Sequence, residues 1–200
     1  LAGLAAALKG RKTRFSYRFI FAPGTIGAIT WLARNEAGTG RIKAGLVVSC
    51  VGDGGGPTYK RSRHGTTKID RVMTHVLRHS APTTADILDF SPYGYDERQY
   101  GSPGFNLPVG LFQRSRYGTF PEYHTSADNL DFIAPEHLAV SYRIVSDMIE
   151  IFETDGKFLN LCPKGEPRFS RYGLSFGGDD SMAMLWVLNL SDGDHTLFDI

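Results

Sequence analysis

The chain has 200 residues, 42% hydrophobic and 12% aromatic, enough apolar material for the core of one globular domain and part of a second. Its 22 basic and 21 acidic residues leave a formal net charge of +1, so no global field favours nucleic acid or a membrane surface. The two cysteines, Cys50 and Cys162, stand far apart. A disulfide framework is therefore not expected, and a reducing cytoplasm is the default compartment.

The apolar start of the chain, residues 1–8, is too short for a membrane span, which needs roughly 18–20 apolar residues. No basic flank precedes it, so it does not fit a secretion signal, and we expect a helix there. Because the chain does not begin with Met, we expect it to be an internal fragment of a longer protein.

Three elements are predicted in the first quarter of the chain. Residues 14–21 alternate aromatic and polar side chains, which indicates a strand. Residues 22–25 break that pattern, and Thr25 is placed to cap a helix over residues 26–34. The nearly continuous apolar run at 44–51 indicates a strand buried on both faces.

The middle of the chain continues the alternation of strands and helices. Strands are predicted at residues 58–62, 87–90 and 109–112, and helices at 67–79 and 135–152. Pro135 suits the first turn of the last of these helices. Alternating strands and helices predict an α/β layered fold.

The composition changes beyond Glu153. Segments rich in glycine, proline and aspartate at 154–156, 163–167 and 173–180 indicate a linker. A helix at 181–190, a turn at 191–196 and the start of another helix at 196–200 are predicted after it.

The loop from Tyr123 to Asn129 carries a histidine and an acid just before the last long helix. The imidazole of His124 can offer one nitrogen to a metal while a nearby carboxylate or carbonyl fixes the other. A lone histidine is more often structural, so both interpretations stay open. Asp53 follows a predicted strand, where open α/β sheets place ligands, or else it shapes a glycine-rich turn.

The segment 93–106 is polar, aromatic and rich in glycine, which is typical of a loop that builds a site. Asp96 and Glu97 form an acidic pair in it, or simply a solvated loop. Tyr95 belongs to an aromatic set that could wall a pocket or pack within the loop. Arg61, in a basic run, could bind a substrate carboxylate or phosphate, or be solvated.

Five stretches together resemble one protein family. They are residues 21–29, 50–53, 59–63, 95–100 and 122–129, the last containing Tyr-His-Thr-x-x-Asp-Asn. They are similar to co-catalytic zinc aminopeptidases of the bacterial leucyl aminopeptidase type, and most of all to a bacterial group described as polysaccharide biosynthesis proteins with an aminopeptidase-like domain. The resemblance implies a partial three-layer α/β fold of the zinc-aminopeptidase (phosphorylase/hydrolase-like) kind with a central mixed sheet. It would occupy residues 1–165, followed by a linker and the start of a winged helix at 166–200.

The resemblance also implies a metal site. His124 would be a zinc ligand and Asp53 a second. Other side chains would hold the ligands in place or contact substrate; these are Asp96, Asp128, Tyr95 and Arg61. The family's first histidine ligand and bridging aspartate would lie before Leu1, so zinc is expected in the full-length protein rather than in this stretch alone.

One departure from the family concerns catalysis. Where the co-catalytic peptidases carry two glutamates, one the general base and one a metal ligand, this chain has Ala22-Pro23-Gly24-Thr25. None of these side chains can accept a proton from an attacking water. Glu97 is the candidate for the missing base, and we expect weak or absent aminopeptidase activity.

Two functions follow as expectations. The first is zinc-dependent hydrolysis of an amide bond in a peptide or amino-sugar conjugate; the alternative is a non-catalytic protein that binds a small ligand and has a regulatory role. The expected partner is a small-molecule or peptide substrate. No membrane partner is expected, nor a nucleic acid given the near-neutral charge, and a homo-oligomer stays open.

Overall fold

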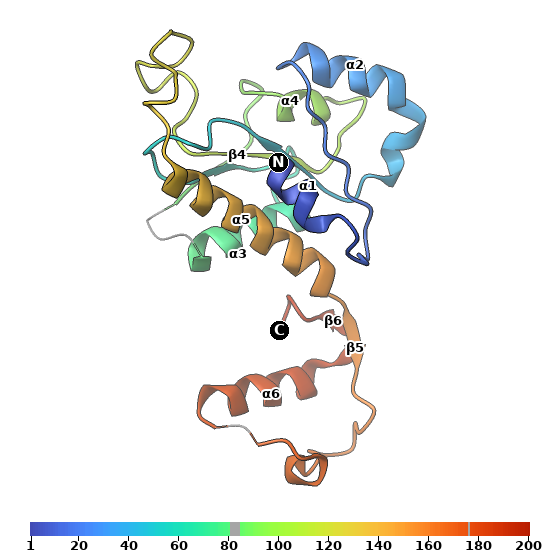
Figure 1. Cartoon of the computed structure of the whole chain (residues 1–200). Coiled ribbons are helices and arrows are strands. Elements are labelled where there is room, and N and C mark those ends of the chain that lie inside the picture. Colours follow the sequence, from blue (N-terminus) through green and yellow to red (C-terminus); the bar gives the residue numbers. More distant parts are fainter. Residues whose placement is uncertain (81–84, 176) are drawn as a thin grey trace. The chain divides into compact units, whose positions relative to one another are not determined.

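The structure is a computed structural model that describes residues 1–80, 85–175 and 177–200. It divides into two compact units, Leu1–Ile149 and Glu150–Ile200, each described here by itself. Figure 1 shows the helices and strands of both units. Within the described ranges, every helix is either too short or too polar to span a lipid bilayer.

A four-stranded mixed sheet forms the centre of the first unit, in the order β1-β4-β2-β3. Its strands are β1 (Gly45–Val48), β2 (Thr58–Lys60), β3 (Asp86–Leu88) and β4 (Val109–Gln113). The pairs β1–β4 and β2–β3 are parallel, whereas β2 and β4 are antiparallel. The predicted α/β fold with a central mixed sheet is thereby confirmed.

Helices cover both faces of this sheet. They are α1 (Ala2–Leu8), α2 (Ile26–Asn35), α3 (Lys68–Ser80), α4 (Glu97–Tyr100) and α5 (Pro135–Thr154), with a 3₁₀ turn, η1, at Glu36–Arg41. In Figure 1, α3 and α5 lie on one side of β4, and α2 and α4 lie on the other. Leu32 of α2 packs against Leu107 and Val109. The layers are therefore helix, sheet and helix.

Two strands, β2 and β4, are fully buried, whereas β1, the strand predicted to be buried on both faces, is not. All five residues of β4 are buried, whereas all four residues of β1 are only half-buried. The reason is the strand order, because β4 has a neighbour on each side and β1 lies at the edge of this sheet. An apolar run predicts a strand well, but it does not predict the position of that strand in the sheet.

The strand predicted at residues 14–21 is wrong, since these residues form no β-strand in the described chain and the backbone bends at residues 14 and 15. Its alternation is nevertheless real, because Phe15 and Tyr17 are half-buried while Ser16 is exposed. The Arg18 guanidinium lies 5.7 Å from the centre of the Trp31 ring, so the segment packs on α2 through side chains. Side-chain alternation records one covered face and does not require a hydrogen-bonded neighbour.

The second unit contains a two-stranded antiparallel sheet of β5 (Lys157–Leu159) and β6 (Asp192–Thr196). Between them lie the 3₁₀ turn η2 (Phe169–Tyr172) and α6 (Asp179–Leu190), which confirms the helix predicted at 181–190. The turn predicted at 191–196 and the helix start at 196–200 are wrong, because β6 occupies the first and a turn follows it. The partner strand β5 is remote in sequence, so local patterns could not predict this pairing. Phe176, inside the predicted linker, lies outside the described residues.

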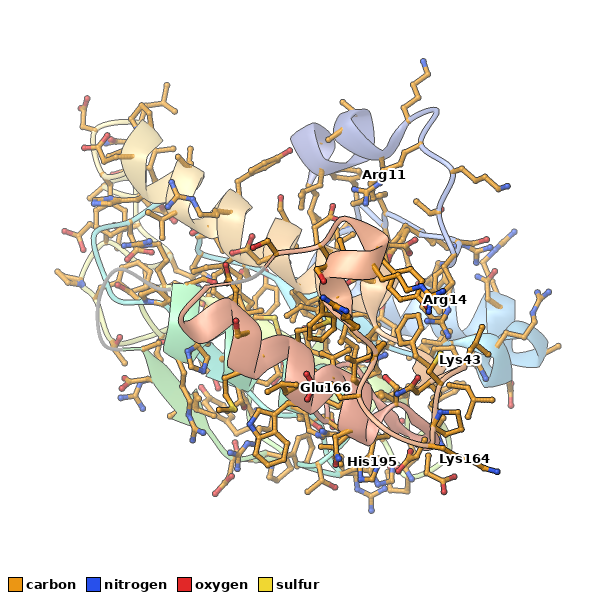
Figure 2. All side chains as sticks on the ribbon, turned by 90° about the horizontal axis from the view of Figure 1, so that it is seen from below. Arg11, Arg14, Lys43, Lys164, Glu166 and His195 are labelled. Carbon is orange, nitrogen blue, oxygen red and sulfur yellow. The ribbon has the colours of Figure 1, made fainter. Side chains whose placement is uncertain are left out.

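Polar contacts at the start of β6 are local. The Asp192 carboxylate accepts hydrogen bonds from the backbone N–H groups of Asp194 and His195, and His195 Nδ1 lies 2.8 Å from Asp192 Oδ2. These contacts lower the pKa of Asp192 to about 2. Figure 2 labels His195 together with Lys164 and Glu166, which lie in the segment between β5 and η2.

Candidate functional site

The candidate site lies where the parallel strands β1 and β4 end. Arg114, directly after β4, donates its backbone N–H to the carbonyl oxygen of Cys50, two residues after β1, at 2.8 Å. Burial raises the pKa of the Cys50 thiol, and the carboxylates of Asp53 and Asp128 raise it further. Ala134, just after the loop that carries His124, donates its backbone N–H to the carbonyl oxygen of Gly52 at 3.0 Å, so this segment also contacts the loop after β1.

Three residues of this region have left-handed backbone conformations. The φ angles are +61° at Thr25, +47° at Cys50 and +61° at His124. Such values are uncommon for residues other than glycine and cost free energy of order 1–3 kcal/mol each. Backbone strain of this kind clusters at ligand and active sites, which supports this edge of the sheet as the site.

Asp53 lies at the predicted edge but uses its carboxylate to build a turn. The side chain is 3% exposed and accepts hydrogen bonds from Gly55 N–H at 2.8 Å, from Ser115 N–H at 3.2 Å and from Ser115 Oγ. A Cβ on Gly55 would overlap Ser115 Oγ, so glycine is needed there. The turn-shaping interpretation therefore describes this conformation, and metal ligation by Asp53 stays a prediction.

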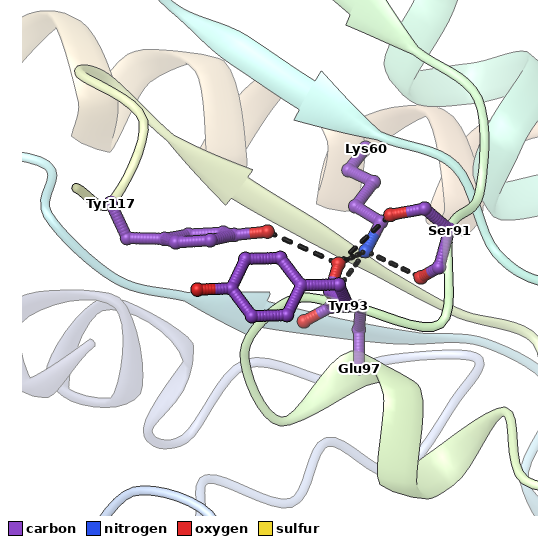
Figure 3. Close-up of polar contacts among 5 residues, drawn as sticks. All are labelled: Lys60, Ser91, Tyr93, Glu97 and Tyr117. Atoms are coloured by element: carbon purple, nitrogen blue, oxygen red, sulfur yellow. Dashed lines mark hydrogen bonds and ion pairs between the residues drawn. The ribbon is translucent and has the colours of Figure 1, made fainter. Parts of the chain in front are cut away.

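Glu97, the candidate base, forms a buried ion pair with Lys60. Its side chain is fully buried, and Lys60 Nζ donates to Glu97 Oε1 at 2.7 Å (Figure 3). Lys60 Nζ also donates to the carbonyl oxygens of Ser91 and Tyr93, at 2.8 Å each. Among the described residues, no group donates to Glu97 Oε2, so this oxygen is the one left for any proton transfer. The geometry supports a role in fixing loop 91–97, and the role as base stays a prediction.

Asp96 and Tyr95 connect this loop to residues 22–25. The Asp96 carboxylate accepts the backbone N–H of Thr25, whose own side chain makes no capping hydrogen bond. A Cβ placed on Gly24 would lie 2.9 Å from the Tyr95 hydroxyl oxygen. Side chains from the 93–97 loop thus occupy the space beside the segment that lacks the family's glutamates.

Tyrosines from two segments contact one another in the same region. The rings of Tyr93 and Tyr117 lie 5.8 Å apart in an edge-to-face arrangement, and the Tyr117 hydroxyl donates to the Tyr93 carbonyl at 3.1 Å (Figure 3). Burial and then the Glu97 carboxylate raise the pKa of Tyr117. Burial and then Cys50 and Tyr95 raise the pKa of Tyr123. The hydrogen bond of Tyr117 joins the segment after β4 to loop 93–97, called the tyrosine loop here.

His124 and Asp128 are both exposed. The His124 ring is stacked on Tyr123 with centroids 4.0 Å apart and an interplanar angle of 16°, which fixes its orientation. Within the described part of the chain, no group of three or more His, Cys, Asp or Glu side chains is placed to hold a metal. Catalytic zinc takes three protein ligands, so these residues do not complete a zinc site by themselves.

Arg61 forms an ion pair with Asp89, with 2.8 Å between Arg61 Nη1 and Asp89 Oδ1. Its proposed contact with a substrate anion is untested. Sequence reasoning missed Arg114 and Ser115, which follow β4 directly and contact the loop after β1. Their position after a predicted buried strand, at the edge where Asp53 was expected, is the signal that could have found them.

Comparisons with known proteins agree with this description. The family model described as "Domain of unknown function (DUF4910)" matches residues 1–155, and the model described as "winged helix-turn-helix" matches residues 157–200. A Clostridium acetobutylicum protein named "Putative polysaccharide biosynthesis protein with aminopeptidase-like domain" is 48% identical over 204 residues, covering 98% of this chain and 46% of that protein.

Solved structures are similar as well. The crystal structure of a "putative peptidase" from Clostridium acetobutylicum has a TM-score of 0.91 and 48% identity, and the match covers 98% of this chain and 45% of that one. An aminopeptidase from Aneurinibacillus sp. strain AM-1 has a TM-score of 0.49 and 18% identity over 64% of this chain and 30% of that one. The chain therefore spans about half the length of the Clostridium relatives.

These matches confirm the resemblance to the bacterial group with an aminopeptidase-like domain and the partial α/β fold followed by winged-helix sequence. The boundary predicted between residues 165 and 166 stays a prediction. The chain belongs to the DUF4910 family, whose model spans residues 1–155, and continues into a winged helix-turn-helix segment.

Proposed function

We propose that the full-length protein hydrolyses an amide bond, in a peptide or an amino-sugar conjugate, at the edge where β1 and β4 end. One observation carries this proposal: the backbone N–H groups of Arg114, after β4, and of Ala134, after the His124 loop, donate to the carbonyl oxygens of Cys50 and Gly52, after β1, at 2.8 and 3.0 Å. Separate loops therefore meet at the carboxyl ends of parallel strands, where α/β folds place their ligands. The relatives named above lend support from outside the chain.

Zinc is the proposed cofactor, with His124 as one ligand. A bound zinc ion polarises a carbonyl and lowers the pKa of a bound water. Because the described residues do not complete a ligand set, the other ligands are proposed to come from the part of the relatives' length that this chain does not span. The stacking of His124 on Tyr123 would hold the imidazole in a fixed orientation.

The remaining residues of the site would bind and orient the substrate. The paired rings of Tyr93 and Tyr117 offer an apolar wall. The hydrogen bond from Thr25 N–H to Asp96 holds the 22–25 segment against the tyrosine loop. No carboxylate stands at residues 22–25, and a general base supplies ~10²–10⁴-fold in rate, so we expect slow turnover.

The second candidate is a non-catalytic ligand-binding protein on the same scaffold. Two observations favour it: residues 22–25 lack an acid, and Lys60 holds the Glu97 carboxylate in a buried ion pair. Under this alternative the tyrosine wall and the strained loops would bind a small ligand without transforming it.

Amide hydrolysis by the full-length protein, supplied with zinc, tests the proposal. We expect aminoacyl anilides to be hydrolysed slowly, and His124→Ala to reduce kcat/KM by at least about 100-fold, the order seen when one catalytic contributor is removed. His79→Ala, which removes an exposed histidine of α3, is the matched control and should change the rate less than about twofold. No hydrolysis by the wild type would favour the binding protein. Equal rates for wild type and His124→Ala would overturn the role of His124.

A further inference from the structure

Arg114 has two buried guanidinium nitrogens, Nε and Nη1, without a hydrogen-bond partner among the described residues. Its side chain follows β4 directly and the residue is 7% exposed. A guanidinium keeps its charge at any ordinary pH, and an unpaired charge is costly to bury. Such a group requires an acceptor that the described protein atoms do not supply.

Asp53 is the nearby carboxylate, but it is engaged elsewhere. Asp53 accepts hydrogen bonds from Ser115, the residue next to Arg114, and its carboxylate opposes the lowering of the Arg114 pKa by burial. No hydrogen bond joins Asp53 and Arg114 among the described residues, and Asp53 accepts instead from Gly55 N–H and from Ser115. Asp53 therefore compensates part of the Arg114 charge and leaves Nε and Nη1 of the guanidinium without an acceptor.

A further nitrogen without a partner lies against the same loop. His137 is in the first turn of the 20-residue helix α5, and its ring nitrogen Nδ1 is buried with no hydrogen-bond partner among the described residues. The neighbouring ring atom, His137 Cε1, lies 3.5 Å from the position of a Cβ on Gly54. The first turn of a helix also presents backbone N–H groups and the positive end of the helix dipole.

Two elements thus place nitrogen donors beside consecutive residues, Asp53 and Gly54. We propose that Arg114 and His137 together bind one carboxylate group of a ligand at the loop 52–56. A carboxylate, with a single negative charge and two acceptor oxygens, suits an arginine and a histidine. A doubly charged phosphate would be repelled more strongly by Asp53. The inference rests on the proposed function and deepens it, because the substrate would then be one that carries a free carboxylate.

Equilibrium binding to the full-length protein tests this proposal without requiring turnover. The probes are N-acetylglycine and N-acetylglycinamide, which differ only in the carboxylate, with inorganic phosphate as a third ligand. Wild type should bind the acid about 10-fold or more tightly than the amide, as expected for a charge-assisted hydrogen bond. In Arg114→Met the preference should fall to less than about twofold. Arg116→Met, which removes an exposed arginine two residues away, is the matched control and should keep the preference.

Several outcomes would overturn the proposal. These are equal binding of acid and amide by wild type, no measurable binding of the acid, tighter binding of phosphate, or an unchanged preference in Arg114→Met. Arg114→Met should unfold at the same or a higher urea concentration than wild type, because it removes an unpaired buried charge. A double-mutant cycle with His137→Ala tests the shared group, and additive losses would show that the two side chains bind separately. Since no hydrolysis is measured, failure here is distinct from failure of the proposed amide hydrolysis.

Discussion

Two regions of the first unit use polar residues in opposite ways. The name floor is used here for three buried charged residues of the sheet and the helices on its two faces: Lys60, Asp70 and Glu97, with residue exposures of 3%, 1% and 0%. The rim, defined as loop 120–132, carries His124 and Asp128, which are exposed. Floor side chains form an ion pair or hydrogen bonds with other buried protein groups and so hold the sheet and its helices together, whereas rim side chains are accessible to a ligand. The acidic and basic residues that a sequence offers as site candidates are therefore of two kinds, buried residues that stabilise the fold and exposed residues that a ligand can reach.

The largest effect should come from breaking the ion pair of the floor. Lys60→Met leaves the Glu97 carboxylate buried without its cation and should lower the free energy of unfolding by about 3–5 kcal/mol. Adding Glu97→Leu should recover part of the loss, because no unpaired charge then remains. Urea denaturation of the full-length proteins measures both values. A double variant less stable than Lys60→Met would contradict a floor held by this pairing.

Substitution of Asp70 should cause the second-largest loss of stability. Its carboxylate accepts hydrogen bonds from the Tyr59 hydroxyl at 2.9 Å and from the N–H groups of Ser62 at 2.6 Å and Thr67 at 2.9 Å, and the hydroxyls of Ser62 and Thr67 add two more. Asp70→Asn turns one acceptor into a donor and should cost about 2–3 kcal/mol in urea denaturation. Asp131→Asn, on the exposed rim, should change the stability by less than about 0.5 kcal/mol.

The contacts of Asp70 should also make the free energy of unfolding depend on pH. Burial alone would raise its pKa, but the hydrogen bonds from Ser62, Thr67 and Tyr59 outweigh burial and hold the pKa below its ordinary value. The stabilisation is therefore fully present above the unfolded pKa of about 3.9 and is lost as the pH falls through the folded pKa. Between about pH 5 and pH 2, wild type should lose stability more steeply than Asp70→Asn. Parallel curves for the two proteins would contradict this role.

A smaller loss of stability is expected from a substitution at Gly94, which lies in the tyrosine loop beside the ion pair of Lys60 and Glu97. A Cβ on Gly94 would overlap Glu97 Oε1 and Lys60 Nζ, so Gly94→Ala should lower stability by about 1–3 kcal/mol. Gly104→Ala has no atom within 4 Å of the new Cβ and is the matched control, expected to be neutral or slightly stabilising. Similar unfolding midpoints for the two variants would show that the loop can move away from the pair.

The smallest effect on stability should come from the rim. The His124 side chain is exposed and contacts Tyr123 by stacking, so His124→Ala should change the free energy of unfolding by less than about 0.5 kcal/mol. Glycine adopts a φ of +61° without a steric cost, so His124→Gly should be at least as stable as His124→Ala. A loss above about 2 kcal/mol in His124→Ala would place His124 with the floor instead.

The two regions also differ in how far the sequence predicts them. Helices with local periodicity, such as α3 and α5, were predicted within a few residues of their observed ends. The contacts of Asp70 with Thr67 follow a capping box, Thr-x-x-Asp, which is a pattern visible in the sequence. The ion pair of Lys60 with Glu97 joins residues 37 positions apart, and no local pattern indicates it.

In the candidate site, too, some features follow from local sequence patterns and others depend on contacts between distant residues. The strand end at Asp53 and the loop at His124 could be proposed from sequence because each stands beside a recognisable element. The contacts that these side chains actually make depend on the order of strands in the sheet. Asp53 binds Ser115, and Glu97 binds Lys60. The residues 14–21 were given a strand for a related reason, since alternation does not reveal whether a neighbouring strand is present.

The zinc content of the full-length protein, compared between wild type and His124→Ala, tests the central claim most directly. That claim is that the rim supplies chemistry and the floor supplies stability. We expect zinc bound in proportion to protein in wild type, a fall of at least about 10-fold in zinc affinity in His124→Ala, and unfolding curves that coincide. Equal zinc content in the two proteins, or no zinc in either, would contradict the role given to His124.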